Sequence, residues 1–262
     1  MLNTPIISGF SSCDRLLTSP FLVPSRFSFL SMERPRPVRP NAMERVKPLA
    51  PKLMINIHPE WVKKLRDDWN ICCSFGFKSD SSKEEFNIIA WARTPQRNYN
   101  VSFEDIYEIG AYADNVKLGD EIVPNTELVR VKLGDTVSLS KGWTISLVEP
   151  PEDVAPDGFR FRTKSDGDAS AVVMKYIHQE MQPVYIAGLG TGPLPSGTYT
   201  IKPTGNVCFF FLGQQEKTVF SLNKVSNPKI IQYAGKLPLT VSYDREGNWI
   251  VGNDIDLDPG SH

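Results

Sequence analysis

The chain has 262 residues, of which 40% are hydrophobic and 23% are charged, and its formal net charge is -1. This composition is typical of a globular protein, and the near-neutral charge excludes a general attraction to nucleic acid or acidic membranes. The length allows one large β domain or two small ones. No stretch approaches the ~18 consecutive apolar residues of a membrane helix, so we expect no membrane span.

We interpret residues 1–52 as a Pro- and Arg-rich N-terminal arm. This segment contains eight prolines, and eight Lys or Arg residues against three acids. The stretch "ERPRPVRPN" alternates Pro with Arg or Val, which favours an extended or disordered chain. The basic residues are spread out, and no Tyr or Trp lies among them to stack on bases. We therefore predict no nucleic-acid partner.

The next element is the only helix that the pattern predicts, in "HPEWVKKLRDDWN". Pro59 suits the first helical position. Trp61, Leu65 and Trp69 recur every four residues and form one apolar stripe. We expect a short helix from Pro59 to Trp69 that lies across an edge or end of a sheet.

After Asn70 the hydrophobic period changes to that of β-strands. Fifteen short candidate strands follow, and turn signals such as "KLGD", "KSDGD" and "DREG" separate them with no helices between. This spacing predicts an all-β fold. The expected architecture is a single antiparallel β-sandwich of two packed sheets over residues 53–252, with one short helix and an acidic tail over residues 253–262.

The most apolar stretch is "NVCFFFLGQQEKTVFSL", which contains six consecutive apolar residues from Val207 to Leu212. Six residues make one strand and cannot cross a membrane. Because both faces of this strand are apolar, we expect it to be buried on both sides. The alternative is that it forms the wall of a ligand site. We expect "GQQEK" to turn the chain and "TVFSL" to return as a half-buried strand.

The same region carries a resemblance to known proteins. The segments "NVCFFFLGQQEKTVFSLNKVSNPKIIQY" and "LTVSYDREGNWI", with "VSFEDIYEIGAYADNVKLGD" upstream, resemble uncharacterised small fungal β-sandwich proteins. The resemblance covers about 150 residues, from near Val101 to Trp249. It implies a compact β-sandwich of fungal origin, and it implies no activity and no site residue.

Cysteine and histidine positions bear on location and cofactors. Cys72 and Cys73 are adjacent and Cys208 lies in the apolar run, as expected for buried thiols of a reducing compartment, so we predict a cytoplasmic protein. No pair of histidines has the spacing of metal ligands. The Gly-rich stretch "GLGTGPLPSG" leads into Pro193 rather than a helix that could hold phosphate. We predict no metal and no cofactor.

Strand periodicity gives one candidate site. In "SAVVMKYIHQEM" the side chains of Tyr176, His178 and Glu180 share a face with apolar residues, and in "VSFEDIYEI" Asp105 shares a face with Phe103. An acid on an apolar face needs a partner or has a raised pKa. We therefore predict a cavity between the strands. Its candidate catalytic residues are His178, Asp105 and Glu180, and its candidate ligand-binding residues are Tyr107, Tyr176, Trp91 and Phe159. The alternative is that each is a satisfied rim or turn residue.

Three classes of function remain open at this stage. The favoured one is a ligand- or partner-binding β-sandwich, lectin-like or toxin-like, that takes a small molecule or glycan and is able to form a homo-oligomer. The second is a cofactor-independent enzyme of secondary metabolism, a cyclase or isomerase that uses an acid/base pair in an internal cavity. The third is a self-assembling structural protein with an N-terminal arm. Fold alone does not choose among them.

Overall fold

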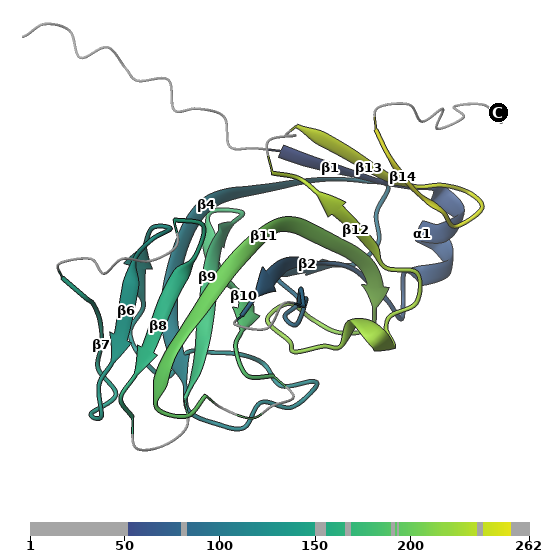
Figure 1. Ribbon diagram of the computed structural model, residues 1–262. Helices are drawn as coiled ribbons and strands as arrows, with labels where there is room; N and C mark the ends of the chain where they lie inside the picture. The colour runs from purple at the N-terminus through teal and green to yellow at the C-terminus, as the bar shows by residue number, and fades with distance from the viewer. Residues whose placement is uncertain are drawn as a thin grey trace, which may run out of the picture. The chain divides into compact units, whose positions relative to one another are not determined.

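The computed structural model describes residues 52–79, 83–149, 156–165, 169–189, 192, 194–234 and 238–252, all within the unit Pro48–His262. Except for Lys52, the predicted arm and the acidic tail lie outside these residues. Strands dominate the described part, in two packed sheets with one short α-helix (Figure 1). The prediction of an all-β sandwich is confirmed.

Each sheet has seven strands within the described residues. The first contains, in spatial order, β10 (Glu180–Ile186), β9 (Ser170–Ile177), β4 (Asn98–Tyr112), β1 (Lys52–Ile57), β13 (Leu239–Tyr243) and β14 (Trp249–Val251), and β5 (Val129–Val131) also pairs with β4. The second contains β3 (Trp91–Arg93), β2 (Asn70–Lys78), β11 (Gly197–Leu212), β8 (Phe159–Thr163), β6 (Thr136–Leu139) and β7 (Ile145–Leu147), and β12 (Lys229–Gln232) also pairs with β11.

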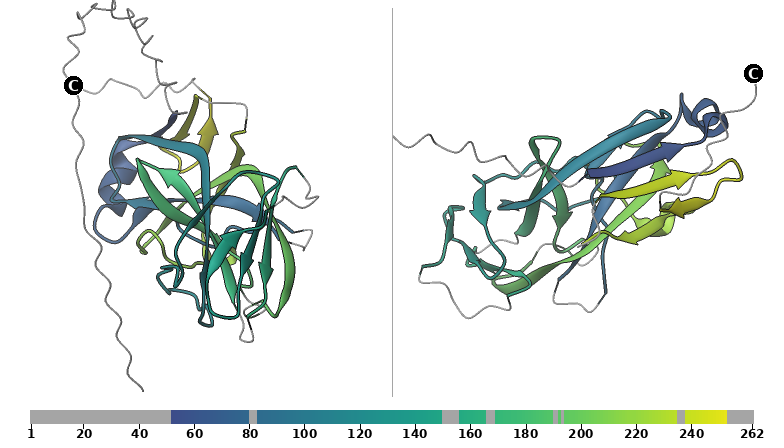
Figure 2. Two further views of the ribbon diagram at one scale, coloured as in Figure 1. Left: turned by 90° about the vertical axis from the view of Figure 1, so that its left-hand side faces the viewer. Right: turned by 90° about the horizontal axis from the view of Figure 1, so that it is seen from above.

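The sheets are mixed rather than purely antiparallel, which corrects one part of the prediction. β1 pairs in parallel with β13, and β6 pairs in parallel with β8. The views in Figures 1 and 2 agree in placing β1, near the start of the domain, beside β13, near its end. Strand periodicity could not show this, because it reports which side chains share a face and not the direction of a neighbouring strand.

The core lies between the two sheets. β1 shows how the sequence produces it: Leu53, Ile55 and Ile57 are at most 1% exposed, whereas the alternate residues Lys52 and Met54 face outward. This is the period of two that places alternate side chains on opposite faces. The second sheet contributes five phenylalanines, among other side chains, to the same core. These are Phe75, Phe77, Phe159, Phe161 and Phe209.

The helix α1 (Pro59–Leu65) is shorter than predicted. His58 caps it, since its Nδ1 accepts a hydrogen bond from the backbone N–H of Glu60 at 3.3 Å. Trp61 packs against Tyr243 at the end of β13, with ring centres 5.3 Å apart. A turn follows Leu65, so Trp69 lies outside the helix and is 40% exposed. The helix packs on the end of a sheet as expected, and only its last turn was wrongly predicted.

Phe211 and Leu212, the last two residues of the run predicted to be buried on both faces, are partly exposed. The other four, Val207 to Phe210, are buried on both faces as predicted. All four residues are 0% exposed. Val207 and Phe209 face the core between the sheets, whereas Cys208 and Phe210 pack on the outer side against Phe220. The outer cover comes from loop segments. The prediction that "TVFSL" returns as a regular strand was wrong, because this segment makes only isolated bridges, at Thr218 and Val219.

Candidate functional site

The predicted strand around His178 is a hairpin. β9 ends at Ile177 and β10 begins at Glu180, and the two residues between them have φ of 49° for His178 and 70° for Gln179. Two residues with positive φ make a tight hairpin turn whose twist matches the flanking strands. Such turns are usually signalled by Asn-Gly or Asp-Gly. The prediction of a continuous strand was therefore wrong. The error arose because His-Gln carries no such turn signal.

The inward face of β9 is also the opposite of the predicted one. Val173 and Ile177 belong to the core between the sheets, and Lys175 is 0% exposed. Val172 and Met174 face a separate cluster on the outer side of the sheet. Because apolar residues occur on both faces of β9, periodicity alone could not identify the inner one. The polar residue of β9 inside the sandwich is therefore Lys175, and not Tyr176 or His178 as predicted.

The ammonium group of Lys175 lies among four aromatic rings. Its Nζ is 4.4 Å from the ring centre of Tyr107, 5.5 Å from those of Phe75 and Phe103, and 6.0 Å from that of Tyr233. The negative faces of aromatic rings attract a cation, and more strongly where water is excluded. Nζ also donates hydrogen bonds to Asp105 Oδ1 at 2.5 Å and to the Tyr107 hydroxyl at 3.0 Å.

A break in β4 places Asp105 against this lysine. The register between β4 and β9 shifts between Glu104 and Tyr107, so Tyr107 lies opposite Lys175. Such bulges re-aim side chains. Asp105 is not on an inward face as predicted, because its side chain is 75% exposed. Its carboxylate nevertheless accepts a hydrogen bond from the Tyr107 hydroxyl at 3.2 Å, so these two predicted site residues lie together.

The electrostatics of this cluster follow from burial. Removal from water lowers the pKa of Lys175, and the Asp105 carboxylate opposes that shift. Burial likewise raises the pKa of Tyr107, with further contributions from Tyr233 and Asp105. Burial also raises the pKa of Tyr233. Both phenols therefore stay protonated at neutral pH and act as hydrogen-bonding groups.

A cavity of about 550 Å³ lies against this cluster. Asp105, Tyr107 and Tyr233 form its polar side. The other lining residues come from the end of β5, the turn after it, an irregular part of β11 and the residue after Tyr233. They are Val131, Lys132, Leu133, Pro203, Thr204, Gly205 and Ala234. The backbone N–H of Tyr233 donates to the Gly205 carbonyl at 3.0 Å, which fixes two of these segments together.

The remaining predicted site residues lie elsewhere. Phe159 is 0% exposed and packs on the Tyr107 ring at 5.2 Å, so it supports the site from within the core. Tyr176 is partly exposed on β9, in register with Glu104. Trp91, His178 and Glu180 line a small second cavity of about 90 Å³. The predicted site residues are therefore divided between two cavities, and they do not form one site.

The second cavity has its own ion pair. Arg93 donates to Glu216 at 2.6 Å, and both residues line the cavity. His178 lies 6.3 Å from Trp91 between ring centres. Burial, and then the charge of Arg93, lower the pKa of His178. His178 is therefore neutral at physiological pH. Among the described residues no hydrogen bond joins it to Glu180, which accepts one from Gln182 at 3.2 Å.

Two residues of the larger site were missed. Lys175 has a signal in the sequence, because it is the only charged residue in the apolar stretch "SAVVMKYI". Tyr233 has none, because it follows β12 and reaches the cluster only through the pairing of β12 with β11. Within the described part of the chain, no group of three or more His, Cys, Asp or Glu side chains is placed to hold a metal ion.

No protein family, curated protein or solved structure matches this chain. The resemblance to small fungal β-sandwich proteins therefore stays a prediction. None of the helices in the described residues is long and apolar enough to cross a membrane.

Proposed function

We propose that this protein binds a small hydroxyl-bearing molecule, such as a saccharide unit, in the cavity beside Asp105. The observation that carries the proposal is the ion pair between Lys175, which is fully buried, and Asp105, which is 75% exposed. A buried charge costs several kcal/mol, so a core selected for stability alone does not need one. Perturbed ionisable groups at a cavity are the usual mark of a ligand site.

The chemistry of the cavity supports the ligand class. Lys175 and Tyr107 both bond to Oδ1 of Asp105, and no described group bonds to Oδ2. An exposed carboxylate oxygen held in place in this way accepts hydrogen bonds from hydroxyl groups. Val131, Leu133 and Pro203 supply apolar walls for the C–H faces of a ring. The volume falls in the ~300–1,000 Å³ range of small-molecule sites.

The test begins with a glycan array and a library of small polyols, followed by titration calorimetry on each hit. We expect Tyr233→Phe and the double variant Asp105→Asn/Lys175→Met to bind about tenfold more weakly or worse. Glu60→Gln is the matched control, because it also removes an exposed carboxylate with a basic partner, Arg245 at 3.3 Å, but on α1. Absence of any binding, or hits whose affinity the cavity variants leave unchanged, would refute the proposal.

One observation favours a second candidate, a cofactor-independent enzyme. The Tyr107 hydroxyl lies between an ammonium and a carboxylate, 3.0 Å from Lys175 Nζ and 3.2 Å from Asp105 Oδ1. A protonated phenol in this position could donate a hydrogen bond or its proton to a bound molecule. The discriminating result is Tyr107→Phe with affinity retained and turnover lost, measured by NMR of the bound compound and its product.

The wider setting belongs to the same proposal. We infer a reducing, cytoplasmic location, because Cys72, Cys73 and Cys208 are free and buried. A fungal source, a lectin-like or toxin-like role and homo-oligomer formation remain predictions. Self-assembly through the N-terminal arm concerns residues outside the described part of the chain. Sedimentation of the full chain and of a chain starting at residue 48 would test it.

A further inference from the structure

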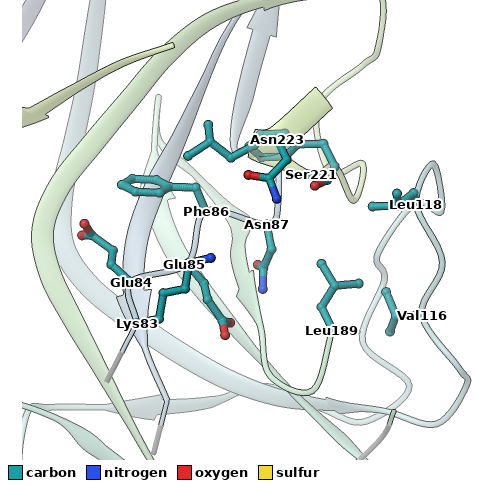
Figure 3. Close-up of a pocket in the computed structure, with 12 residues that line it drawn as sticks. Lys83, Glu84, Glu85, Phe86, Asn87, Val116, Leu118, Leu189, Ser221 and Asn223 are labelled. Carbon is teal, nitrogen blue, oxygen red and sulfur yellow. The ribbon is translucent and has the colours of Figure 1, made fainter. Parts of the chain in front are cut away.

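A third cavity, of about 470 Å³, lies on the outer side of the sandwich and is built from loops (Figure 3). Lys83, Glu84, Glu85 and Phe86 lie on one side of it in the figure, and Val116, Leu118 and Leu189 lie on the other. From this cavity we infer a second ligand site, which takes a small, mainly apolar molecule with one carbonyl-type hydrogen-bond acceptor. The inference does not depend on the Asp105 site.

Backbone hydrogen bonds hold the walls of this cavity in a preformed arrangement. The N–H of Gly119 donates to the Val219 carbonyl at 2.8 Å, and the N–H of Val219 donates to the Asp120 carbonyl at 2.9 Å. The N–H of Phe220 donates to the Asn87 carbonyl at 3.1 Å. Three segments distant in the sequence are thereby joined, and a preformed wall reduces the entropy that a ligand must lose on binding.

The apolar part of the lining comes from two separate clusters. Phe86 and Phe220 belong to the cluster that covers β2 and β11. Val116 and Leu189 pack against the cluster that covers the outer face of β9. The cavity lies where these two clusters meet, and Leu118, which is 45% exposed, stands at its side. An apolar molecule here would remove that surface from water, which favours binding at about 25 cal/mol per Å².

The polar groups define the rest of the ligand. Glu85 accepts a hydrogen bond from the Tyr185 hydroxyl at 3.0 Å, and Glu84 accepts from Asn206 at 2.9 Å and from Thr204. The Asn87 side-chain amide exchanges hydrogen bonds with the backbone of Ile186.

One oxygen of each carboxylate, Oε1 of Glu84 and Oε2 of Glu85, is therefore engaged within the protein, as is the Asn87 amide. Lys83 and the Asn223 amide, which Figure 3 shows at opposite sides, make no side-chain hydrogen bond or ion pair within the described residues. Lys83 can only donate and the Asn223 amide can donate as well as accept, so an acceptor such as a carbonyl or carboxylate oxygen is the ligand group that both can bind.

The experiment uses the full chain and a neutral solvatochromic dye with a carbonyl group, Nile red, whose emission shifts to the blue in an apolar site. Three exposed leucines provide matched variants: Leu118 at 45%, Leu133 at 47% and Leu147 at 38% exposure. Leu118 lines this cavity, Leu133 lines the Asp105 cavity, and Leu147 lies on β7. Because all three are exposed, replacement by Asp leaves the core intact.

We expect Leu118→Asp to weaken dye binding about tenfold, with wild-type affinity in Leu133→Asp and Leu147→Asp. Displacement of the dye by toluene, acetophenone and benzoate, which each contain one benzene ring, tests the need for an acceptor. Acetophenone or benzoate should displace the dye at lower concentration than toluene. The variants Asn223→Ala and Lys83→Met show which donor is used. Loss of binding in Leu133→Asp alone, equal binding in all variants, or toluene as the best competitor would overturn the inference. The polyol titrations at Asp105 are read separately, so either site can fail alone.

Discussion

Removing the Asp105 carboxylate should destabilise the fold through Lys175, which then lies in the core without a counter-ion. Loss of one partner of a buried pair costs about 3–5 kcal/mol. Two features reduce that cost here. Asp105 is 75% exposed, so water screens the pair. The four aromatic rings continue to stabilise the ammonium by about 0.5–2 kcal/mol. We therefore expect Asp105→Asn to lower the free energy of unfolding by about 1–3 kcal/mol at pH 7.

Removing the lysine should have a different result. Lys175→Met keeps a chain of similar length, and replacing a buried charge by an apolar side chain is often neutral or stabilising by about 1–4 kcal/mol. Asp105 then returns to water without penalty. We expect Lys175→Met to be at least as stable as wild type, and Asp105→Asn to cost almost nothing in that background.

The assay is equilibrium urea unfolding followed by tryptophan fluorescence. The free energies of unfolding of the four members of the double-mutant cycle are compared, provided that their m-values are equal. Glu60→Gln reports the loss of an exposed pair, with an expected effect below about 1 kcal/mol. The reasoning is refuted if Asp105→Asn is as stable as wild type, or if it destabilises equally with and without Lys175.

Two further predictions concern pH and the hairpin. Burial raises the pKa of Tyr107, so the unfolded phenol ionises first and the stability contributed by this group is lost as the pH rises above about 10; Tyr107→Phe should therefore lose stability less steeply than wild type in alkaline urea titrations, and parallel curves would contradict this. Replacing His178-Gln179 by Asn-Gly should stabilise the turn by about 0.5–1 kcal/mol, because both positions have positive φ. Ligand binding at Asp105 should be unchanged in that variant, and a lower midpoint of urea unfolding would show that the two side chains stabilise the fold.

The sequence was sufficient for the class of fold because local chemistry decides it. Alternation in β1, the Pro59 start of α1 and the doubly apolar run at Val207 each depend on neighbours within a few residues. The parallel pairing of β1 with β13 joins residues 186 positions apart, such as Asn56 and Ser242. No periodicity reports a contact of that kind, so the mixed sheets could not be predicted.

The candidate site was predicted only in part for a related reason. Asp105 and Tyr107 could be assigned to one site because they are two residues apart on one strand, and the hydrogen bond between them joins them there. The inner face of β9 was misassigned because both of its faces carry apolar residues. Which face can bury a charged residue then depends on whether a neighbouring strand supplies an oppositely charged side chain. For Lys175 that partner is Asp105, and the bulge that places it there has no Gly to signal it.

The Asp105 cavity also coincides with breaks in both sheets. β4 shifts register between Glu104 and Tyr107, and β11 shifts register against β2 between Pro203 and Val207. The residues at both breaks line the same cavity. Each break gives up regular ladder hydrogen bonds, and bulges are found preferentially beside binding and active sites. A sandwich needs neither break for its core, and the fact that the two meet at one cavity, against the buried lysine, is the strongest reason to test ligand binding there first.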